Sequence, residues 1–472
     1  MIRVLSHAVI SVLLTGLGSG GPPDGQEPVM GLIGQVRPAI VAILQGGPAG
    51  PVQVSSGCLI HQKGFIITTD LPIRGCPGLV LTDDLVLYPY QVVGRLPEKD
   101  ICLLRIDRDG SQAYLRLGSS KGLAAGHRVL VAGNPGGRGV AFAERLIANP
   151  AVAPSTQDVL EIAGLGPDQM DRFIQLDGRV TGLVGGPVID TDGNVIGIIT
   201  SKAMTEDGVN LAVPVDRIRA FFYELLAPEE RGGFWTGLEV NTMTNNATIL
   251  LVDPEGPAAK VGLAPGDQIL AVYGRPIRDG TDWLMALVGR RPGEALVLVV
   301  GRQDHQPSRR ECTVNLQPYP QKALTARQGL SEGIWYAVFR GRFSRLPDFG
   351  QLEPVTYGQA SGIGLSGIEG LEQEDFALVF DGFIDVPRSG VYRIVLGSDD
   401  GSVLLLDGAP AIDNDGIHPY QEASAVRHLS AGLHHIRLGY FQRTGRADLR
   451  LRVEPDNLAG DQQPIPLRLL CD

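Results

Sequence analysis

The sequence predicts a mainly β protein that folds as several domains in tandem. Its 472 residues are enough for about three domains of ordinary size. The chain holds 62 glycines and 33 prolines, and its apolar segments are mostly short and rich in Val, Ile and Leu, so turns between strands should outnumber long helices. Hydrophobic residues make up 43% of the chain and charged residues 20%, which is typical of folded cores rather than of disorder.

The charge of the chain argues against one class of partner. The formal net charge is -11 at pH 7. Phosphate backbones are bound by clustered Lys and Arg side chains, and an acidic chain offers few of these clusters. The sequence therefore predicts no nucleic-acid partner.

The N-terminus has the pattern of an export signal. A basic start at Met1–Arg3 is followed by an apolar run from Val4 to Leu17 and by the small residues Gly18–Gly20. A membrane-spanning helix needs roughly 18 or more apolar residues, so this run is short for a span. Residues 1–20 are predicted to be the signal peptide of an exported, periplasmic or extracellular protein, with an N-terminal anchor as the alternative. No later segment is long and apolar enough to cross a bilayer, so we expect no membrane span in the mature chain.

The five cysteines are too few and too scattered for a disulfide scaffold. They are Cys58, Cys76, Cys102, Cys312 and Cys471. Export would permit a local disulfide between Cys58 and Cys76, and free buried thiols are the other interpretation.

The first domain is organised around the segment from Arg179 to Ile198. It reads as a tight loop supported by glycines, a short apolar strand, an Asp-Gly turn and a second apolar strand. This segment resembles the part of HtrA-type, trypsin-like serine proteases that carries the nucleophile, usually written Gly-Asn-Ser-Gly-Gly-Pro-Leu. The positions of Asn and Ser hold Leu183 and Val184 here.

Other segments match the same family in the same order. They are the hairpin formed by Ser55–Ile60 and Gly64–Thr68, and the segments Val92–Leu104, Gly126–Gly136 and Asn210–Pro214. The resemblance implies a trypsin-like double β-barrel over residues 31–226. Asp216–Leu226 is expected to be a closing helix because its apolar residues have helical spacing. The segment Ala227–Gly233 is interpreted as a charged, glycine-containing linker.

By this resemblance, two of the three catalytic positions have lost their chemistry. Leu71 stands at the position of the general base and Val184 at that of the nucleophile, and neither hydrocarbon side chain can transfer a proton. Asp100 occupies the position of the carboxylate that orients the histidine, but it has no imidazole to orient. The sequence therefore predicts a degenerate triad at Leu71, Asp100 and Val184, and no catalytic residue.

A working peptidase that uses other residues is the alternative. His61, His127, Thr181 and Ser201 lie near the lost positions in the sequence, and backbone amides from Gly182 to Val184 could still form an oxyanion pocket. Catalysis requires a nucleophile and a base within hydrogen-bond reach of each other, whereas each of these side chains is more simply explained as a framework or surface group.

The second domain, residues 233–318, has its clearest signal from Val252 to Ile277. This stretch reads as a strand, a short helix opened by Pro-Ala-Ala, a Gly-Asp turn and another strand, and it resembles the PDZ domain that follows the protease domain in HtrA proteins. PDZ domains bind a peptide as an added strand and hold its terminal carboxylate with backbone N–H groups. The predicted partners are thus protein C-termini or extended peptides.

The resemblance also implies the peptide-binding residues of this domain. They are Trp235, Thr236, Gly237 and Leu238 in the carboxylate loop, and Leu284 and Leu287 on the helix that forms the far wall of the groove. Thr236 departs from the apolar residue that is usual at its position. The alternative is that Leu284 and Leu287 are only core residues and that the groove is idle.

The third domain, residues 329–456, is followed by a predicted C-terminal tail, residues 457–472. The segments Phe380–Ile394, Ser398–Gly408, Leu429–Tyr440 and Ala447–Leu451 have alternating apolar residues that predict a sandwich core. They resemble the protective-antigen (PA14) β-sandwich family.

Some PA14 domains bind sugars through calcium held by adjacent aspartates, which match Asp399 and Asp400 here. Calcium takes roughly 6 to 8 oxygen ligands, so two carboxylates on one turn are only a beginning. The loop Gln442–Arg446 offers cations where sugar-binding members commonly have an asparagine. Glycan binding with calcium is one expectation for this domain, and a turn-stabilising or protein-contact role is the other. No other cofactor is expected.

Together these observations predict a secreted, noncatalytic HtrA-like pseudoprotease. Its PDZ domain would bind protein termini or peptides, and its PA14 domain would attach it to glycans or another surface. Because HtrA relatives often form trimers, a homo-oligomer is also compatible with the resemblance. An active HtrA-class serine endopeptidase with non-standard residues remains the alternative.

Overall fold

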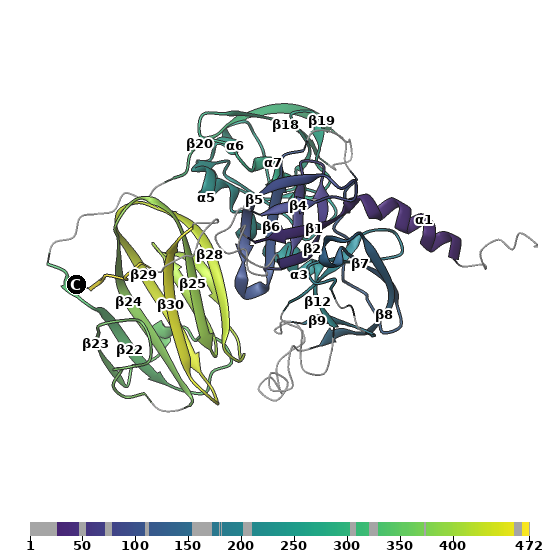
Figure 1. Cartoon of the computed structure of the whole chain (residues 1–472). Helices are drawn as coiled ribbons and strands as arrows, with labels where there is room; N and C mark the ends of the chain where they lie inside the picture. Colours follow the sequence, from purple (N-terminus) through teal and green to yellow (C-terminus); the bar gives the residue numbers. More distant parts are fainter. Residues whose placement is uncertain are drawn as a thin grey trace, which may run out of the picture.

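The computed structural model of the chain confirms the mainly β architecture (Figure 1). It describes residues 26–46, 53–70, 78–108, 113–152, 172–178, 180, 182–201, 210–302, 308–320, 329–371, 374–456 and 465–471. Residues 1–20, Leu71, Cys76 and Thr181, on which parts of the sequence interpretation depend, lie outside these ranges.

The first domain begins with helix α1 (Gln26–Val36) and the short 3-10 helix η1 (Arg37–Ala39), followed by two closed six-stranded barrels. The first barrel contains β1 (Ile40–Gln45), β2 (Gln53–His61), β3 (Phe65–Thr68), β4 (Leu79–Leu81), β5 (Leu87–Leu96) and β6 (Ile101–Ile106), in the order β1-β2-β3-β6-β5-β4. The second contains β7 (Arg128–Gly133), β8 (Ala141–Val152), β9 (Phe173–Leu176), β10 (Pro187–Ile189), β11 (Val195–Ile199) and β12 (Asn210–Pro214), in the order β10-β11-β12-β9-β8-β7.

The predicted hairpins of this domain are confirmed. β2 pairs with β3, and β10 pairs with β11 around the predicted Asp-Gly turn. The short 3-10 helices η2 (Pro97–Lys99) and η3 (Pro135–Gly137) begin with proline, whose fixed φ suits the first turn. Strands β10 and β11 are buried along their whole length, which explains their nearly continuous apolar sequences.

Three short helices close the domain. The predicted helix is present as α3 (Val215–Ala220) and α4 (Phe222–Leu226), interrupted at Phe221. The interpretation of Ala227–Gly233 as a linker is wrong. This segment forms helix α5 (Pro228–Gly232), which is flanked by left-handed residues at both ends and buries two glutamates. Its burial arises from contacts with both neighbouring domains, which the local sequence does not reveal.

The second domain combines small sheets with two helices. Its elements are β13 (Phe234–Trp235), β14 (Leu238–Val240), β15 (Ile249–Val252), α6 (Pro257–Lys260), β16 (Gln268–Val272), β17 (Arg275–Pro276), α7 (Gly280–Leu287), β18 (Ala295–Arg302), β19 (Ser308–Asn315) and β20 (Gln317–Pro318). The main sheet has the order β17-β16-β18-β19, and the pairs β14-β15 and β13-β20 stand apart from it. Asp279 caps α7 by accepting the N–H of Asp282.

The third domain is a two-sheet sandwich. Its elements are β21 (Ser331–Glu332), β22 (Ile334–Arg340), η4 (Phe349–Gln351), β23 (Thr356–Ala360), β24 (Phe376–Val386), β25 (Gly390–Asp399), β26 (Ser402–Leu406), β27 (Ala409–Asn414), β28 (Gln421–Leu429), β29 (Gly432–Gln442), β30 (Asp448–Pro455) and β31 (Leu469–Cys471). The larger sheet is centred on β24 and β29, and the smaller has the order β28-β25-β30. The predicted tail is corrected in part, since β31 pairs with both β24 and β21.

The three domains share contacts. One apolar cluster runs from the first barrel through α3 and α4 into the second domain, whereas the second barrel and the sandwich have cores of their own. Arg231, at the end of the first domain, donates from Nη1 to the carbonyl oxygen of Val93 at 2.8 Å and from Nε to Asp456 of the sandwich at 2.7 Å. Arg393 of β25 donates to the carbonyl oxygen of Arg95 at 2.6 Å. The sandwich is therefore held against β5, beside which Figure 1 shows it.

Two further sequence expectations are addressed by the described residues. Within those ranges, no helix is both long and apolar enough to cross a membrane. Cys58 is a free, buried thiol whose pKa is raised by burial, so a disulfide from it to Cys76 is not formed. Cys102, Cys312 and Cys471 are also free.

Candidate functional site

The first candidate site surrounds Asp100, at the position of the orienting carboxylate. Asp100 follows η2 with a left-handed φ of 56° and is only 3% exposed. Its Oδ2 accepts the hydroxyl of Thr200 and the N–H of Ser201, the latter at 2.7 Å. Its Oδ1 accepts the hydroxyl of Ser201 at 2.9 Å and the N–H of Asp70 at 3.2 Å. Four donors thus hold the carboxylate, and it joins the first barrel to the end of β11.

An ion pair holds Asp70, the last described residue before the predicted base position. Arg95 makes a bidentate contact with Asp70, from Nε at 2.7 Å and from Nη2 at 3.0 Å. Burial raises the pKa of Asp70, while its hydrogen bonds and ion pair with Arg95 oppose that rise. The backbone beside position 71 is therefore anchored, although Leu71 itself is outside the described residues.

The loop predicted to occupy the nucleophile position contains Val184 and is shaped by two glycines. Val184 is half-buried against the core of the second barrel, and its carbonyl oxygen accepts the N–H of Ser56 at 2.9 Å. Gly182 and Gly185 have φ values of 81° and 82°. A Cβ on Gly185 would lie 2.3 Å from the carbonyl oxygen of Ser56, so only glycine fits there. In the described part of the chain, the N–H groups of Gly182 and Val184 have no acceptor.

The described members of the alternative catalytic set, His61, His127 and Ser201, are not assembled into a dyad. His61 is buried, and its Nδ1 accepts the N–H of Lys63 at 3.1 Å. Nδ1 of His127 accepts the N–H of Ala124 at 3.3 Å on the surface. The Ser201 hydroxyl donates to Asp100, and Thr181 lies outside the described residues. Across the residues that the structure covers, no hydrogen bond connects His61 or His127 to Ser201.

The second candidate site is a groove of about 500 Å³ between β14 and α7. β14 pairs with β15 on one side only among the described strands, so its other edge is open toward the helix. The residues that line the groove are Ala220, Tyr223, Glu229, Leu238, Glu239, Val240, Asn241, Thr242, Met243, Leu250, Trp283, Leu284 and Leu287. Of the residues predicted for peptide binding, Leu238, Leu284 and Leu287 line this groove.

The predicted carboxylate loop contains an acidic partner that the sequence interpretation missed. Thr236 is fully buried, and both its N–H and its hydroxyl donate to Oε1 of Glu229, at 2.7 Å and 2.5 Å. The N–H of Leu238 donates to the hydroxyl oxygen of Thr236 at 3.1 Å. Gly237 makes the turn with a φ of 72°, and Trp235 precedes it in β13. A proline followed by two acids is a helix-start signal that could have revealed α5 and hence Glu229.

Burial has the largest influence on the pKa of Glu229. It raises the pKa of Glu229 to about 7, although the hydrogen bonds from Thr236 oppose the rise. The neighbouring Glu230 accepts the hydroxyls of Tyr223 and Tyr319, at 3.0 Å and 3.2 Å. The pKa of Tyr223 is raised by burial and by the two glutamates.

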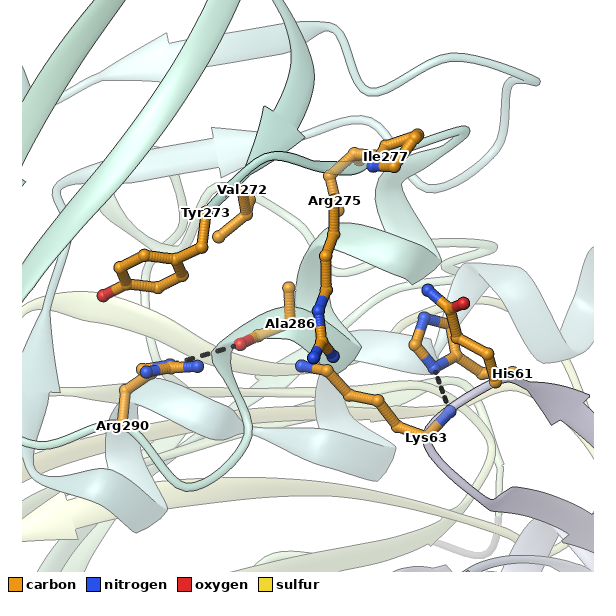
Figure 2. Close-up of a pocket in the computed structure, with 10 residues that line it drawn as sticks. His61, Lys63, Val272, Tyr273, Arg275, Ile277, Ala286 and Arg290 are labelled. Carbon is orange, nitrogen blue, oxygen red and sulfur yellow. Dashed lines mark hydrogen bonds between the residues drawn. The ribbon is translucent and has the colours of Figure 1, made fainter. Parts of the chain in front are cut away.

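A separate cavity of about 320 Å³ lies between the first barrel and the second domain. Figure 2 shows Lys63, Arg275 and Arg290 directed into it, from the β2–β3 turn, from β17 and from the segment after α7. His61 borders the same space, and burial lowers its pKa to about 4, so its imidazole is neutral at pH 7.

The predicted calcium residues of the sandwich lie on the turn after β25. Oδ1 of Asp400 accepts the N–H of His418 at 3.2 Å, and Oδ2 accepts the N–H of Arg443 at 2.9 Å. The backbone carbonyl of Asp399 accepts the Tyr440 hydroxyl. No group of three or more His, Cys, Asp or Glu side chains suited to a metal occurs in the covered ranges. Both oxygens of Asp400 are engaged by backbone donors, so this donor set fits the turn-stabilising role better than a calcium site.

These features define a tandem protein with a trypsin-fold domain, a PDZ-like domain and a C-terminal β-sandwich. Family comparisons agree with this division. The trypsin-like peptidase domain family matches residues 55–198, the PDZ domain family residues 236–315 and the PA14 domain family residues 327–464.

Several individual proteins are similar to this chain. A probable periplasmic serine endoprotease, DegP-like, of Bartonella henselae is 27% identical over 319 residues, covering 64% of this chain and 59% of the relative. Serine protease HTRA1 of Xenopus tropicalis is 27% identical over 277 residues, covering 53% and 58%. The solved structure of the HtrA-type protease AlgW with a tripeptide shares 25% identity, covers 62% of this chain and 98% of its own, and has a TM-score of 0.35.

The chain spans between half and three-fifths of the length of the curated relatives it matches. It is similar to HtrA- and DegP-like serine proteases, and its sequence matches the trypsin-like peptidase, PDZ and PA14 domain families.

Proposed function

We propose that this protein is an exported, noncatalytic HtrA-like pseudoprotease that binds extended peptides in the groove between β14 and α7. The observation that carries the proposal is the open edge of β14 facing the apolar side chains of α7 across a groove of about 500 Å³. Export is supported by the relatives, which include proteins named periplasmic.

Binding follows from the physics of an unpaired strand. The N–H and C=O groups on the open edge of β14 can pair with an added strand, which supplies affinity that depends little on sequence. Leu238, Leu284 and Leu287 supply apolar surface for alternate side chains of that strand. The occupant is therefore an extended segment with apolar residues.

The noncatalytic part of the proposal rests on side-chain chemistry. Val184 offers no proton and no lone pair at the nucleophile position, and Leu71 offers none at the base position. Asp100 is fully engaged by four donors as a structural carboxylate. The shape of the protease fold is retained as a scaffold for the groove.

Peptide binding is tested with the full chain and a fluorescein-labelled peptide that ends in Tyr-Val-Phe, with its terminus amidated. Fluorescence anisotropy should show saturable binding that weakens at least tenfold in Leu284→Ala. Leu251→Ala is the matched control because Leu251 lies on the neighbouring strand, is 51% exposed and does not line the groove. Equal binding by both variants would remove the groove from the function, and binding by none would reject the proposal.

The active-peptidase alternative is tested by incubating the full chain with a fluorophosphonate probe and with casein. We expect neither labelling nor turnover. A probe adduct mapped to any side chain of the first domain, together with turnover that is lost in Asp100→Ala, would establish the peptidase instead.

A further inference from the structure

The carboxylate loop of the PDZ domain already contains a carboxylate from its own chain. In PDZ domains the backbone N–H groups of this loop receive the C-terminal carboxylate of the peptide. Here the N–H of Thr236 donates to Glu229 at 2.7 Å, and the N–H of Leu238 donates to the Thr236 hydroxyl oxygen at 3.1 Å. Two donors of the loop are therefore used before any peptide arrives.

Glu229 is also fixed in place. It is 6% exposed and lines the same groove as Leu284 and Leu287. Helix α5, which carries it, is held by Tyr223 and Tyr319 through Glu230. Moving the carboxylate away would leave the buried N–H and hydroxyl of Thr236 without an acceptor, which is unfavourable.

We propose that Glu229 is a built-in carboxylate ligand of this loop, so the groove selects internal extended segments over free C-termini. The proposal rests on the proposed peptide-binding function and names its class of occupant. A terminal carboxylate would face the charge of Glu229 and find the loop donors engaged, whereas a strand that passes the loop or ends in a neutral group pairs with β14 without this conflict.

The experiment compares two forms of the Tyr-Val-Phe peptide, one with a free carboxylate and one with a carboxamide. Both are titrated by anisotropy against the full chain at pH 8, above the pKa of about 7 for Glu229. The wild type should bind the amide at least tenfold more tightly. Glu229→Ala should gain at least tenfold in affinity for the acid form, while its affinity for the amide changes less than threefold.

Two further variants separate charge from structure. Glu229→Gln removes the charge but keeps an acceptor oxygen for Thr236, so it should reduce the discrimination against the acid form less than Glu229→Ala does, without loss of folding. Glu230→Gln is the control, because its carboxylate accepts from tyrosines rather than from the loop. It should leave the ratio of the two affinities unchanged.

The possible outcomes separate the role of Glu229 from the peptide binding on which it rests. If the wild type binds the acid form as tightly as the amide, or more tightly, the role of Glu229 is rejected while peptide binding stands. If neither form binds to the wild type or to folded Glu229→Ala, peptide binding and the role of Glu229 fail together. Binding of the acid form only after Glu229→Ala would confirm that this side chain occludes the loop.

An independent observation concerns the cavity between the first barrel and the PDZ domain. Three cations line its 320 Å³ (Figure 2). The side chains of Lys63 and Arg275 have no hydrogen-bond or ion-pair partner among the described residues, whereas Arg290 contacts Glu294 at 3.3 Å. Burial and the charges of Arg290, Arg275 and Arg105 lower the pKa of Lys63 to about 8.

This concentration of positive charge is unusual in a chain with a net charge of -11. Arg275 is exposed and Lys63 and Arg290 are half-buried, so solvent screens part of their mutual repulsion, and an anion bound between them would relieve the rest. We infer that the cavity binds a small anion with several charges, of the phosphate-ester or pyrophosphate class. The anion would join the β2–β3 turn to β17 and to the segment after α7, and so would bind across two domains.

Calorimetry of the full chain with inorganic pyrophosphate tests this site. Pyrophosphate should bind and raise the melting temperature, and the double variant Lys63→Met/Arg275→Met should weaken binding at least tenfold. The control is Lys260→Met/Arg309→Met, which removes the same charge from exposed positions outside the cavity. Equal weakening in both variants, or equal stabilisation by sodium chloride at the same ionic strength, would reject the site.

A second arm identifies the source of the phosphate. Vesicles of phosphatidylglycerol replace pyrophosphate in a sedimentation assay of the wild type and both double variants. Sedimentation that requires Lys63 and Arg275 would assign a lipid headgroup as the ligand, and its absence beside pyrophosphate binding would assign a free anion.

Discussion

Two buried carboxylates of this molecule are held in nearly the same way and face different surroundings. Asp100 accepts the hydroxyl of Thr200 and a backbone N–H, and Glu229 accepts the hydroxyl and the N–H of Thr236. Asp100 lies between the two barrels with every donor internal. Glu229 borders a groove with an open strand edge. The comparison teaches that hydrogen-bond donors alone do not decide whether a buried carboxylate affects binding. A ligand can compete for those donors only where the carboxylate lies beside an accessible groove.

The largest effect on stability is expected from removing the carboxylate of Asp100. Asp100→Ala leaves the buried donors of Thr200, Ser201 and Asp70 without an acceptor. Since each costs about 1–3 kcal/mol, we expect the free energy of unfolding to fall by about 4 kcal/mol. Urea denaturation followed by near-ultraviolet circular dichroism measures this. Asp192→Ala, at an exposed turn position, should change it little. Equal effects would show that Asp100 has no special structural role.

The carboxyl group of Glu229 should make the stability of the protein depend on pH. The pKa of Glu229 is raised from 4.5 to about 7 in the folded chain, so the folded state holds the proton more tightly than the unfolded state does. The resulting stabilisation is fully present below pH 4.5 and is lost as pH rises through about 7, a change of about 3 kcal/mol.

Melting temperatures of the wild type and Glu229→Gln across this range provide the measurement. Glu229→Gln should flatten the dependence, whereas Glu230→Gln should retain it. The charged and titratable groups around Glu229 are Glu230, Tyr223 and Tyr319, and the tyrosines remain neutral over this range. A wild-type profile that rises toward neutral pH at this site would contradict the assignment.

A smaller effect is expected at the nucleophile position. Val184→Ser places a hydroxyl in a loop that still has its glycines. Because serine buries less apolar surface than valine does, the free energy of unfolding should fall by about 1 kcal/mol. No fluorophosphonate labelling should appear, since Leu71, at the predicted base position, cannot accept the proton of the new hydroxyl. Rapid labelling of this single variant would mean that a base is present after all.

The smallest effect is expected from calcium. The carboxylate of Asp400 already accepts N–H groups from His418 and Arg443, and burial raises its pKa, so calcium would have to share its oxygens with these donors. Titration calorimetry of the full chain should show no uptake, and Asp399→Asn should melt at the same temperature with calcium or with a chelator. Stoichiometric uptake that this variant loses would restore the glycan hypothesis.

Much of the fold could be predicted because each domain carries its signals locally. Turn residues and apolar strands define the hairpins β2–β3 and β10–β11, and the Pro-Ala-Ala and Gly-Asp signals place α6 and the turn before β16. The resemblance to PDZ domains, rather than any local pattern, suggested Leu238, Leu284 and Leu287, which line the groove.

The parts that were missed depend on distant contacts. Glu230 receives a hydrogen bond from Tyr319, 89 residues away, and this contact helps to turn a polar, glycine-ended segment into the buried helix α5. Strand β31 is likewise fixed by pairing with β24, far earlier in the chain. The Pro-Glu-Glu start signal could have indicated helix α5, but no local pattern shows that its glutamates are buried, so the place of Glu229 in the groove could not be predicted.

The hydrogen bonds of Arg231 connect the domains mechanically. One guanidinium group is hydrogen-bonded to Val93 in the first barrel, to Leu225 and Leu226 in α4 and to Asp456 of the sandwich. Tension applied to the C-terminal sandwich would therefore reach helix α5 directly through the guanidinium of Arg231, while Arg393 and Arg95 form a second link between the sandwich and the first barrel. A molecule anchored at one end and loaded at the other could in this way transmit force to the very helix that holds Glu229.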